Sequence, residues 1–121
     1  PVHSKRDMMH RHNSYFIGNF EDIKLVGFKS QFTMMYGDNS DIYFAKVEKG
    51  IGLNKTSKLE GIKKNNFIGT YIIGPILILN PLFTKKIIKM LGVELKEDAK
   101  IALEDDTMAA YDARLKELER L

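Results

Sequence analysis

The sequence predicts an α/β fold in which the strands come first and the helices last. Up to residue 73, short apolar and aromatic runs alternate with turn residues, which is typical of strands. After residue 80, apolar residues recur at spacings of three and four, which is typical of helices. The chain has 121 residues, 44% of them hydrophobic and 29% charged, so it is one globular domain at most or a piece of one.

The first two strands are predicted at residues 14–20 and 23–28, whose sequences are SYFIGNF and IKLVGF. Only Glu21 and Asp22 separate them. Such a short polar connection favours a hairpin with a tight turn.

Residues 31–36 form a third short apolar run, and residues 42–47 form a fourth. Between them, Gly-Asp-Asn-Ser at 37–40 is a strong turn signal. Residues 50–58 are rich in glycine, asparagine and lysine and predict a loop. Residues 67–73 give the clearest strand of the chain, without alternation, as expected for a strand buried on both faces.

A helix is predicted to open at Asn80-Pro81, with asparagine at the N-cap and proline at N1. Its apolar stripe consists of Phe83, Ile87, Ile88 and Leu91. Gly92 follows where a glycine often ends a helix, and lysines near that end suit the helix dipole.

Two further helices are predicted, one at about 96–103 and one beginning after Asp105-Asp106-Thr107. Asp112 and Lys116 have the spacing of an ion pair on the last helix. The apolar stripe of this helix consists of Met108, Tyr111, Leu115 and Leu118. A terminal stripe of this kind predicts docking on the body of the chain itself; a coiled coil is the alternative, for which the stripe is short.

The composition excludes several classes of function. The chain has no cysteine, so it supplies no disulfide, no thiolate metal ligand and no cysteine nucleophile. Its 19 basic and 16 acidic residues are interspersed, which argues against nucleic-acid binding. The longest apolar stretch, 67–79, is too short to span a bilayer, and the N-terminus has no apolar signal core, so we expect a cytoplasmic protein that does not bind membranes. A start at Pro1 fits either a trimmed methionine or the remains of a longer polypeptide.

No metal or cofactor site is predicted. His3, His10 and His12 lie before the first strand, and no carboxylate or cysteine joins them in a ligand pattern. The glycines of Gly50-x-Gly52 lack the lysine and hydroxyl of a phosphate-binding loop. The acidic run 104–106 is of the kind that stabilises the positive end of a helix, and Met34 and Met35 are expected to fill the core or a sheet edge.

Four motifs occur in an order that resembles one protein family. They are Ile-Gly-Asn at 17–19, Leu-Val-Gly-Phe at 25–28, a Gly-x-Gly-x-Asn loop ending in Glu-Gly over 50–61, and Asn-Pro at 80–81 preceded by a Gly-Thr-Tyr segment. The positions of that segment that match the family motif, or replace a residue of it, are Gly69, Thr70, Tyr71, Ile73, Gly74 and Pro75. Together they resemble class I glutamine amidotransferases of the cobyric acid synthase type, which include the glutaminase subunit of lipid II isoglutaminyl synthase.

The resemblance covers about residues 14–92. It implies that 14–121 is the C-terminal half of a flavodoxin-like amidotransferase domain, after a polar lead-in at 1–13 and with a helical extension at 93–121. The late strands would form an antiparallel extension with one central strand, covered by the C-terminal helices. Such a half-domain needs further strands, either from an N-terminal segment or from a second copy of the chain.

The departures from the family pattern concern the catalytic residues. In the family, an upstream cysteine attacks the glutamine amide and a late histidine activates it. That histidine aligns with Ile73, the cysteine is not in this chain, and Lys-Ser-Gln at 29–31 replaces Glu-Asn-His. The resemblance therefore assigns no catalytic residue to this chain, and losing such a pair costs about a millionfold in turnover in comparable triads.

The resemblance thus implies a pseudoenzyme of the transferase class, kept for binding or regulation beside a synthetase or ligase. The alternative is the C-terminal half of an active amidotransferase whose cysteine lies in a missing N-terminal segment. A third hypothesis is that the chain is a small binding module of another class. Whether the full protein is an enzyme stays open at this point.

Overall fold

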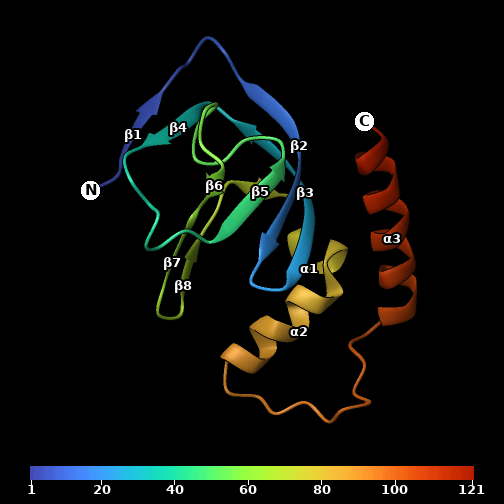
Figure 1. Ribbon diagram of the computed structural model, residues 1–121. Coiled ribbons are helices and arrows are strands. Elements are labelled where there is room, and N and C mark those ends of the chain that lie inside the picture. The colour runs from blue at the N-terminus through green and yellow to red at the C-terminus, as the bar shows by residue number, and fades with distance from the viewer.

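The computed structural model describes residues 1–121 and has a mixed α/β fold. Its main sheet has five strands in the order β6-β5-β2-β3-β9, and two small two-stranded sheets pair β1 with β4 and β7 with β8 (Figure 1). All of these pairings are antiparallel. The strands are β1 (His3–Arg6), β2 (His12–Phe20), β3 (Ile23–Gln31), β4 (Thr33–Tyr36), β5 (Ala45–Lys49), β6 (Leu59–Glu60), β7 (Ile62–Lys64), β8 (Phe67–Gly69) and β9 (Ile72–Ile73). The helices are α1 (Ile76–Leu79), α2 (Pro81–Met90) and α3 (Glu104–Arg120).

The β2–β3 hairpin is the centre of the fold and confirms the predicted pair of strands. The strands pair without interruption from His12 opposite Gln31 to Phe20 opposite Ile23. The turn is tight because Glu21 adopts a positive φ of 53°. Both strands extend past their predicted apolar runs into polar residues.

Strand alternation divides the hairpin into two faces. The inner face is apolar at the turn end of the hairpin and polar at its open end. At the turn end it carries Phe16, Phe20 and Leu25, which are buried in the main core. At the open end the same rows carry polar residues, with Ser14 opposite Lys29 and His12 opposite Gln31.

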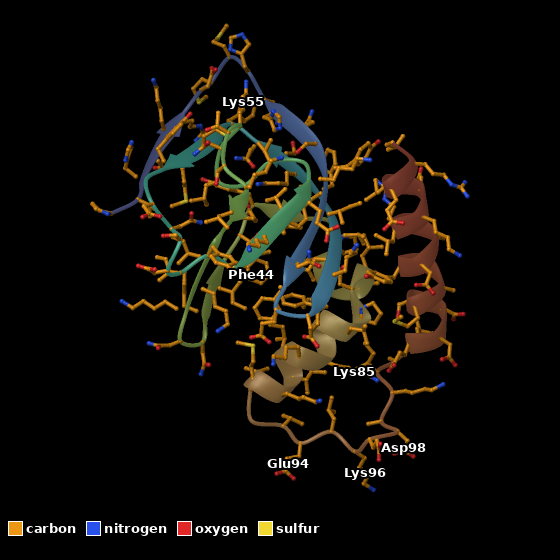
Figure 2. All side chains as sticks on the ribbon, in the orientation of Figure 1. Phe44, Lys55, Lys85, Glu94, Lys96 and Asp98 are labelled. Carbon is orange, nitrogen blue, oxygen red and sulfur yellow. The ribbon has the colours of Figure 1, made fainter.

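The main core is a group of aromatic rings beneath the turn end of the sheet. Phe44 is 2% exposed, and its ring centroid lies 5.1 Å from that of Phe20 and 5.6 Å from that of Phe83. Phe44 reaches this core from the segment before β5, near the middle of the molecule (Figure 2). Because Phe83 belongs to α2, the core joins α2 to the sheet.

Asn80 connects the start of α2 to β3. The expected N-cap position and N1 proline are confirmed, but the Asn80 side chain makes no capping hydrogen bond. Its amide nitrogen donates to the Val26 carbonyl oxygen at 2.9 Å, and its side-chain oxygen accepts from the Val26 backbone N–H at 2.8 Å. The buried Asn80 side chain therefore bonds both backbone groups of Val26, as a neighbouring strand would do.

Helix α3 packs on the outer face of the hairpin, as the predicted docking of its stripe requires (Figure 1). Leu118 is fully buried against Ile17 and Val26. The Tyr111 hydroxyl donates to the Lys24 carbonyl oxygen at 2.8 Å. The predicted pair of Asp112 with Lys116 is absent, and the ion pair within this helix joins Arg114 and Glu117.

The predicted strand at 67–73 is wrong as a single strand. Residues 67–69 form β8 in a hairpin with β7, and Ile72 and Ile73 form β9 at the edge of the main sheet. The chain breaks at Thr70-Tyr71 because both residues bond to the Glu60 carboxylate. Phe67 and Ile73 are exposed, so the run is not buried on both faces.

Other boundaries also differ from the prediction. Residues 96–103 form isolated turns instead of a helix, and Glu94 and Lys96 point away from the body (Figure 2). The last helix begins at Glu104, earlier than predicted, and β5 begins at Ala45 and not at residue 42. Within the polar stretch 1–13, His3–Arg6 form β1 and His12 begins β2. No helix combines the length and the apolar character needed to cross a bilayer.

Candidate functional site

The segment that resembles the amidotransferase motif is fixed to the sheet by a fully buried ion pair. Lys29 on β3 and Glu60 on β6 are both 0% exposed, and the Lys29 Nζ lies 2.5 Å from the Glu60 Oε2. The same ammonium donates to the carbonyl oxygens of Gly52 at 2.6 Å and Ile51 at 3.2 Å. The three donors of the lysine are therefore all used, which a buried charge requires.

The second oxygen of Glu60 holds the motif. Its Oε1 accepts from the Thr70 hydroxyl at 2.9 Å and from the Tyr71 backbone N–H at 2.8 Å. The Thr70 oxygen in turn accepts from the Ile72 backbone N–H at 3.0 Å. These bonds turn the chain from β8 into β9.

Burial governs the titration of the groups around this pair. Burial lowers the pKa of Lys29, although the Glu60 carboxylate opposes the shift. Burial, and secondarily the charge of Glu60, raises the pKa of Tyr71. The Tyr71 ring also lies close to the ammonium, with 5.6 Å between the Lys29 Nζ and the ring centroid. The network is a structural clamp that joins β3, the 50–58 loop, β6 and the motif.

Ile73 lies on the opposite face of the sheet from this clamp. In the register of β9 and β3, Ile72 is opposite Lys29 on the inner face, while Ile73 is opposite Phe28 on the outer face. Phe28 is in turn opposite Tyr15 on β2, with 6.1 Å between the two ring centroids. Ile73 is 46% exposed, so this position presents a hydrocarbon side chain to the surface.

The rest of the motif forms a turn next to this surface. Gly74 has a φ of 70° and an open space where a Cβ would lie, and Pro75 precedes α1 in an extended conformation. Leu77 and Ile78 of α1 are 46% and 65% exposed. Ile73 of β9 and, shortly after it, Leu77 and Ile78 of α1 are thus three exposed apolar side chains, which together we call the β9 surface.

None of the three histidines lies near Ile73. His12 lies on the inner face of β2, whereas Ile73 lies on the outer face of β9. The two positions are separated by three residues along β3 and by two strand spacings, or roughly 14 Å. His3 is in β1, stacked on Tyr36, and His10 pairs with Asp7 in the connection that follows.

The other candidates from the sequence have structural roles. Gly50 has a φ of 98°, and a Cβ there would meet the Tyr15 carbonyl oxygen at 2.4 Å. A Cβ on Gly52 would meet the Leu59 carbonyl oxygen at 2.3 Å, so both glycines allow close packing of the loop. Glu104 pairs with Lys85 of α2 at 2.6 Å, and this bond lowers the pKa of the carboxyl group. Met34 and Met35 on β4 are half-buried.

The ion pair of Lys29 and Glu60 was missed by sequence reasoning, although a signal for it exists. Strand alternation puts Lys29 in the same row as Leu25 and Gly27, which face inward. A lysine in an inward row requires an opposite charge, because buried lysines are almost never unpaired. Glu60 at the end of the 50–61 loop is the acid that the family motif itself supplies.

No family model matches this chain, and no curated protein matches it.

Proposed function

We propose that this chain is a glutamine amidotransferase-like domain that acts by binding and does not hydrolyse glutamine. The observation that carries the proposal is the environment of Ile73. The position that the resemblance assigns to the catalytic histidine holds a hydrocarbon, and its neighbour across the sheet is Phe28. A general base must lie within hydrogen-bond reach of the proton that it removes, and neither side chain can accept a proton.

The same surface supports a binding role. The β9 surface is apolar and exposed, and β9 is the last strand of the main sheet in this chain. An open sheet edge next to exposed apolar side chains favours pairing with another strand. The proposed partner supplies the remaining strands of a flavodoxin-like sheet, either as an N-terminal segment or as a second copy, beside a synthetase or ligase subunit in the cytoplasm.

The alternative function is an active glutamine-hydrolysing amidotransferase whose cysteine lies outside this chain. The specific observation in its favour is the open edge at β9, where the nucleophile-bearing half of such a domain would pair. That enzyme would need a base other than Ile73. The two functions therefore differ in whether the full-length protein has a reactive cysteine that attacks glutamine.

A glutamine-like electrophile distinguishes them. We expect no covalent adduct when the full-length protein is incubated with a chloroketone analogue of glutamine and its intact mass is measured. The physical reason is that the analogue alkylates a cysteine only where a base has generated the thiolate. An active class I glutaminase treated in parallel serves as the reagent control. A single adduct on one cysteine, prevented by excess glutamine, would support the alternative and contradict the proposal.

A further inference from the structure

A second concave site lies at the other end of the sheet from the aromatic core. It is a pocket of about 340 Å³ between β1, the β1–β2 connection, the start of β2, β4 and the 50–58 loop. Lys55, at the tip of that loop, lies at the end of the molecule where the chain passes from β1 to β2 (Figure 2). The volume of this pocket is at the small end of the range for pockets that bind metabolites.

The walls of this pocket are strongly basic. Lys5, Arg11 and Lys55 line it, and none of them is in an ion pair. They come from three different segments, namely β1, the β1–β2 connection and the 50–58 loop. Three cationic groups that converge on one hollow and have no carboxylate partner attract an anion.

The one acidic residue of the pocket is already engaged. Asp7 accepts the backbone N–H groups of Met9 at 2.9 Å and His10 at 3.2 Å through its Oδ1. Its Oδ2 lies 3.0 Å from the His10 Nδ1. These bonds lower the pKa of Asp7, with the Met9 N–H the largest cause. The carboxylate shapes the β1–β2 connection and forms no ion pair with any of the three cations.

A histidine with a buried ring nitrogen also lines this pocket. The Nε2 of His12 is buried and has no hydrogen-bond partner, although His12 lines the pocket. Two other buried polar atoms without partners belong to adjacent positions of the same inner face, the Ser14 hydroxyl and the Gln31 Oε1. A buried polar atom without a partner is costly in a folded protein, and these three atoms lie at the open end of the hairpin, where His12 lines the pocket.

We infer that this pocket binds a small molecule through a diphosphate or polyphosphate group held by Lys5, Arg11 and Lys55. Phosphate oxygens accept from lysine ammonium groups and from the guanidinium fork of arginine at the same time. A diphosphate carries enough negative charge to meet three cations, whereas a single carboxylate does not. This inference does not depend on the proposed amidotransferase-like function.

Two aromatic rings extend the site beyond the phosphate group. Phe32 lines the pocket beneath the Arg11 guanidinium, whose carbon lies 4.6 Å from the ring centroid. Tyr36, also in the lining, is 39% exposed. An exposed ring next to a phosphate site offers a stacking surface for a planar group such as a nucleobase. The chemistry therefore fits either inorganic diphosphate or a nucleoside diphosphate.

Titration calorimetry of the full-length protein with inorganic pyrophosphate tests the site. We expect saturable binding with one site per chain, and we expect Lys55→Gln to weaken it about tenfold, because one charge-assisted hydrogen bond is lost. The matched control is Lys64→Gln at the end of β7, which removes the same charge from an exposed position outside the pocket. The Lys64→Gln variant should bind pyrophosphate with the same affinity as the wild type.

Two further measurements locate and define the ligand. The ring-proton signal of His12 in nuclear magnetic resonance spectra should shift on addition of pyrophosphate, since His12 lines the pocket. ADP that binds more tightly than pyrophosphate would identify a nucleotide, and equal affinities would identify the diphosphate group alone. Absence of saturable binding, or equal weakening by Lys55→Gln and Lys64→Gln, would overturn the inference, as would binding only to long polyanions.

Discussion

Replacement of Lys29 by methionine is expected to destabilise the protein by about 3–5 kcal/mol. The change leaves the Glu60 carboxylate fully buried without its cation, and it also leaves the carbonyl oxygens of Ile51 and Gly52 without their donor. Breaking one side of a buried pair costs more than the pair contributes, because the remaining charge is uncompensated. The free energy of unfolding from urea denaturation measures the effect.

A double variant separates the effect of the unpaired Glu60 charge from the effect of lost packing around Lys29. Glu60→Gln keeps an oxygen for Thr70 and Tyr71 but removes the charge, so Lys29→Met with Glu60→Gln should be more stable than Lys29→Met alone. Lys24→Met is the exposed control, since Lys24 and Glu48 are 35% and 43% exposed and such pairs contribute about 0–1 kcal/mol. Equal losses for Lys29→Met and Lys24→Met would contradict the role of the clamp.

Replacement of Phe44 by alanine is expected to cost about 3–5 kcal/mol, because it leaves a cavity at the centre of the main core. Phe44 is 2% exposed and lies against the rings of Phe20 and Phe83, so the cavity also weakens the attachment of α2. Urea denaturation again gives the free energy of unfolding. A milder loss is expected for Phe44→Leu, which keeps most of the volume.

Phe67→Ala provides the matched control for the core. It deletes the same ring, but Phe67 is 64% exposed at the β7–β8 turn, so a change within about 0.5 kcal/mol is expected. If Phe67→Ala destabilised the protein as much as Phe44→Ala, the core would not be centred on Phe44.

The hairpin and the second helix were predictable because their signals are local. Two apolar runs separated by Glu21 and Asp22 leave little choice but a tight turn, and Asn80-Pro81 with Gly92 marks both ends of α2. The break of the 67–73 run was not predictable in this way. It depends on Glu60, which bonds Tyr71 across 11 positions of the sequence, and periodicity carries no information on such a bond.

The helix predicted at 96–103 failed for a different reason. The segment has suitable residues, but few of its side chains are even half-buried, so no apolar face packs against the body. Short helices are marginal in water without tertiary packing. Two turn bonds remain, from Ala99 N–H to the Lys96 oxygen and from Glu104 N–H to the Ile101 oxygen.

Of the candidate site, the sequence could indicate the positions that resemble the amidotransferase motif, including Ile73, which aligns with the histidine of that motif. It could not indicate that Thr70 and Tyr71 face a buried ion pair while Ile73 faces outward, because this depends on the register of β9 against β3. The basic pocket was also not predictable, since Lys5, Arg11 and Lys55 meet only when β1 and the 50–58 loop reach the same end of the sheet.

The most direct test of the proposed function is the release of ammonia from glutamine by the full-length protein. The wild type and the conservative variant Ile73→Leu are both predicted to stay at the level of the heat-inactivated sample, because a hydrocarbon at position 73 neither activates a nucleophile nor protonates the leaving group. Glutamine-dependent ammonia release by the wild type, at the turnover of about 1 per second or more that is common for enzymes, would contradict the proposal.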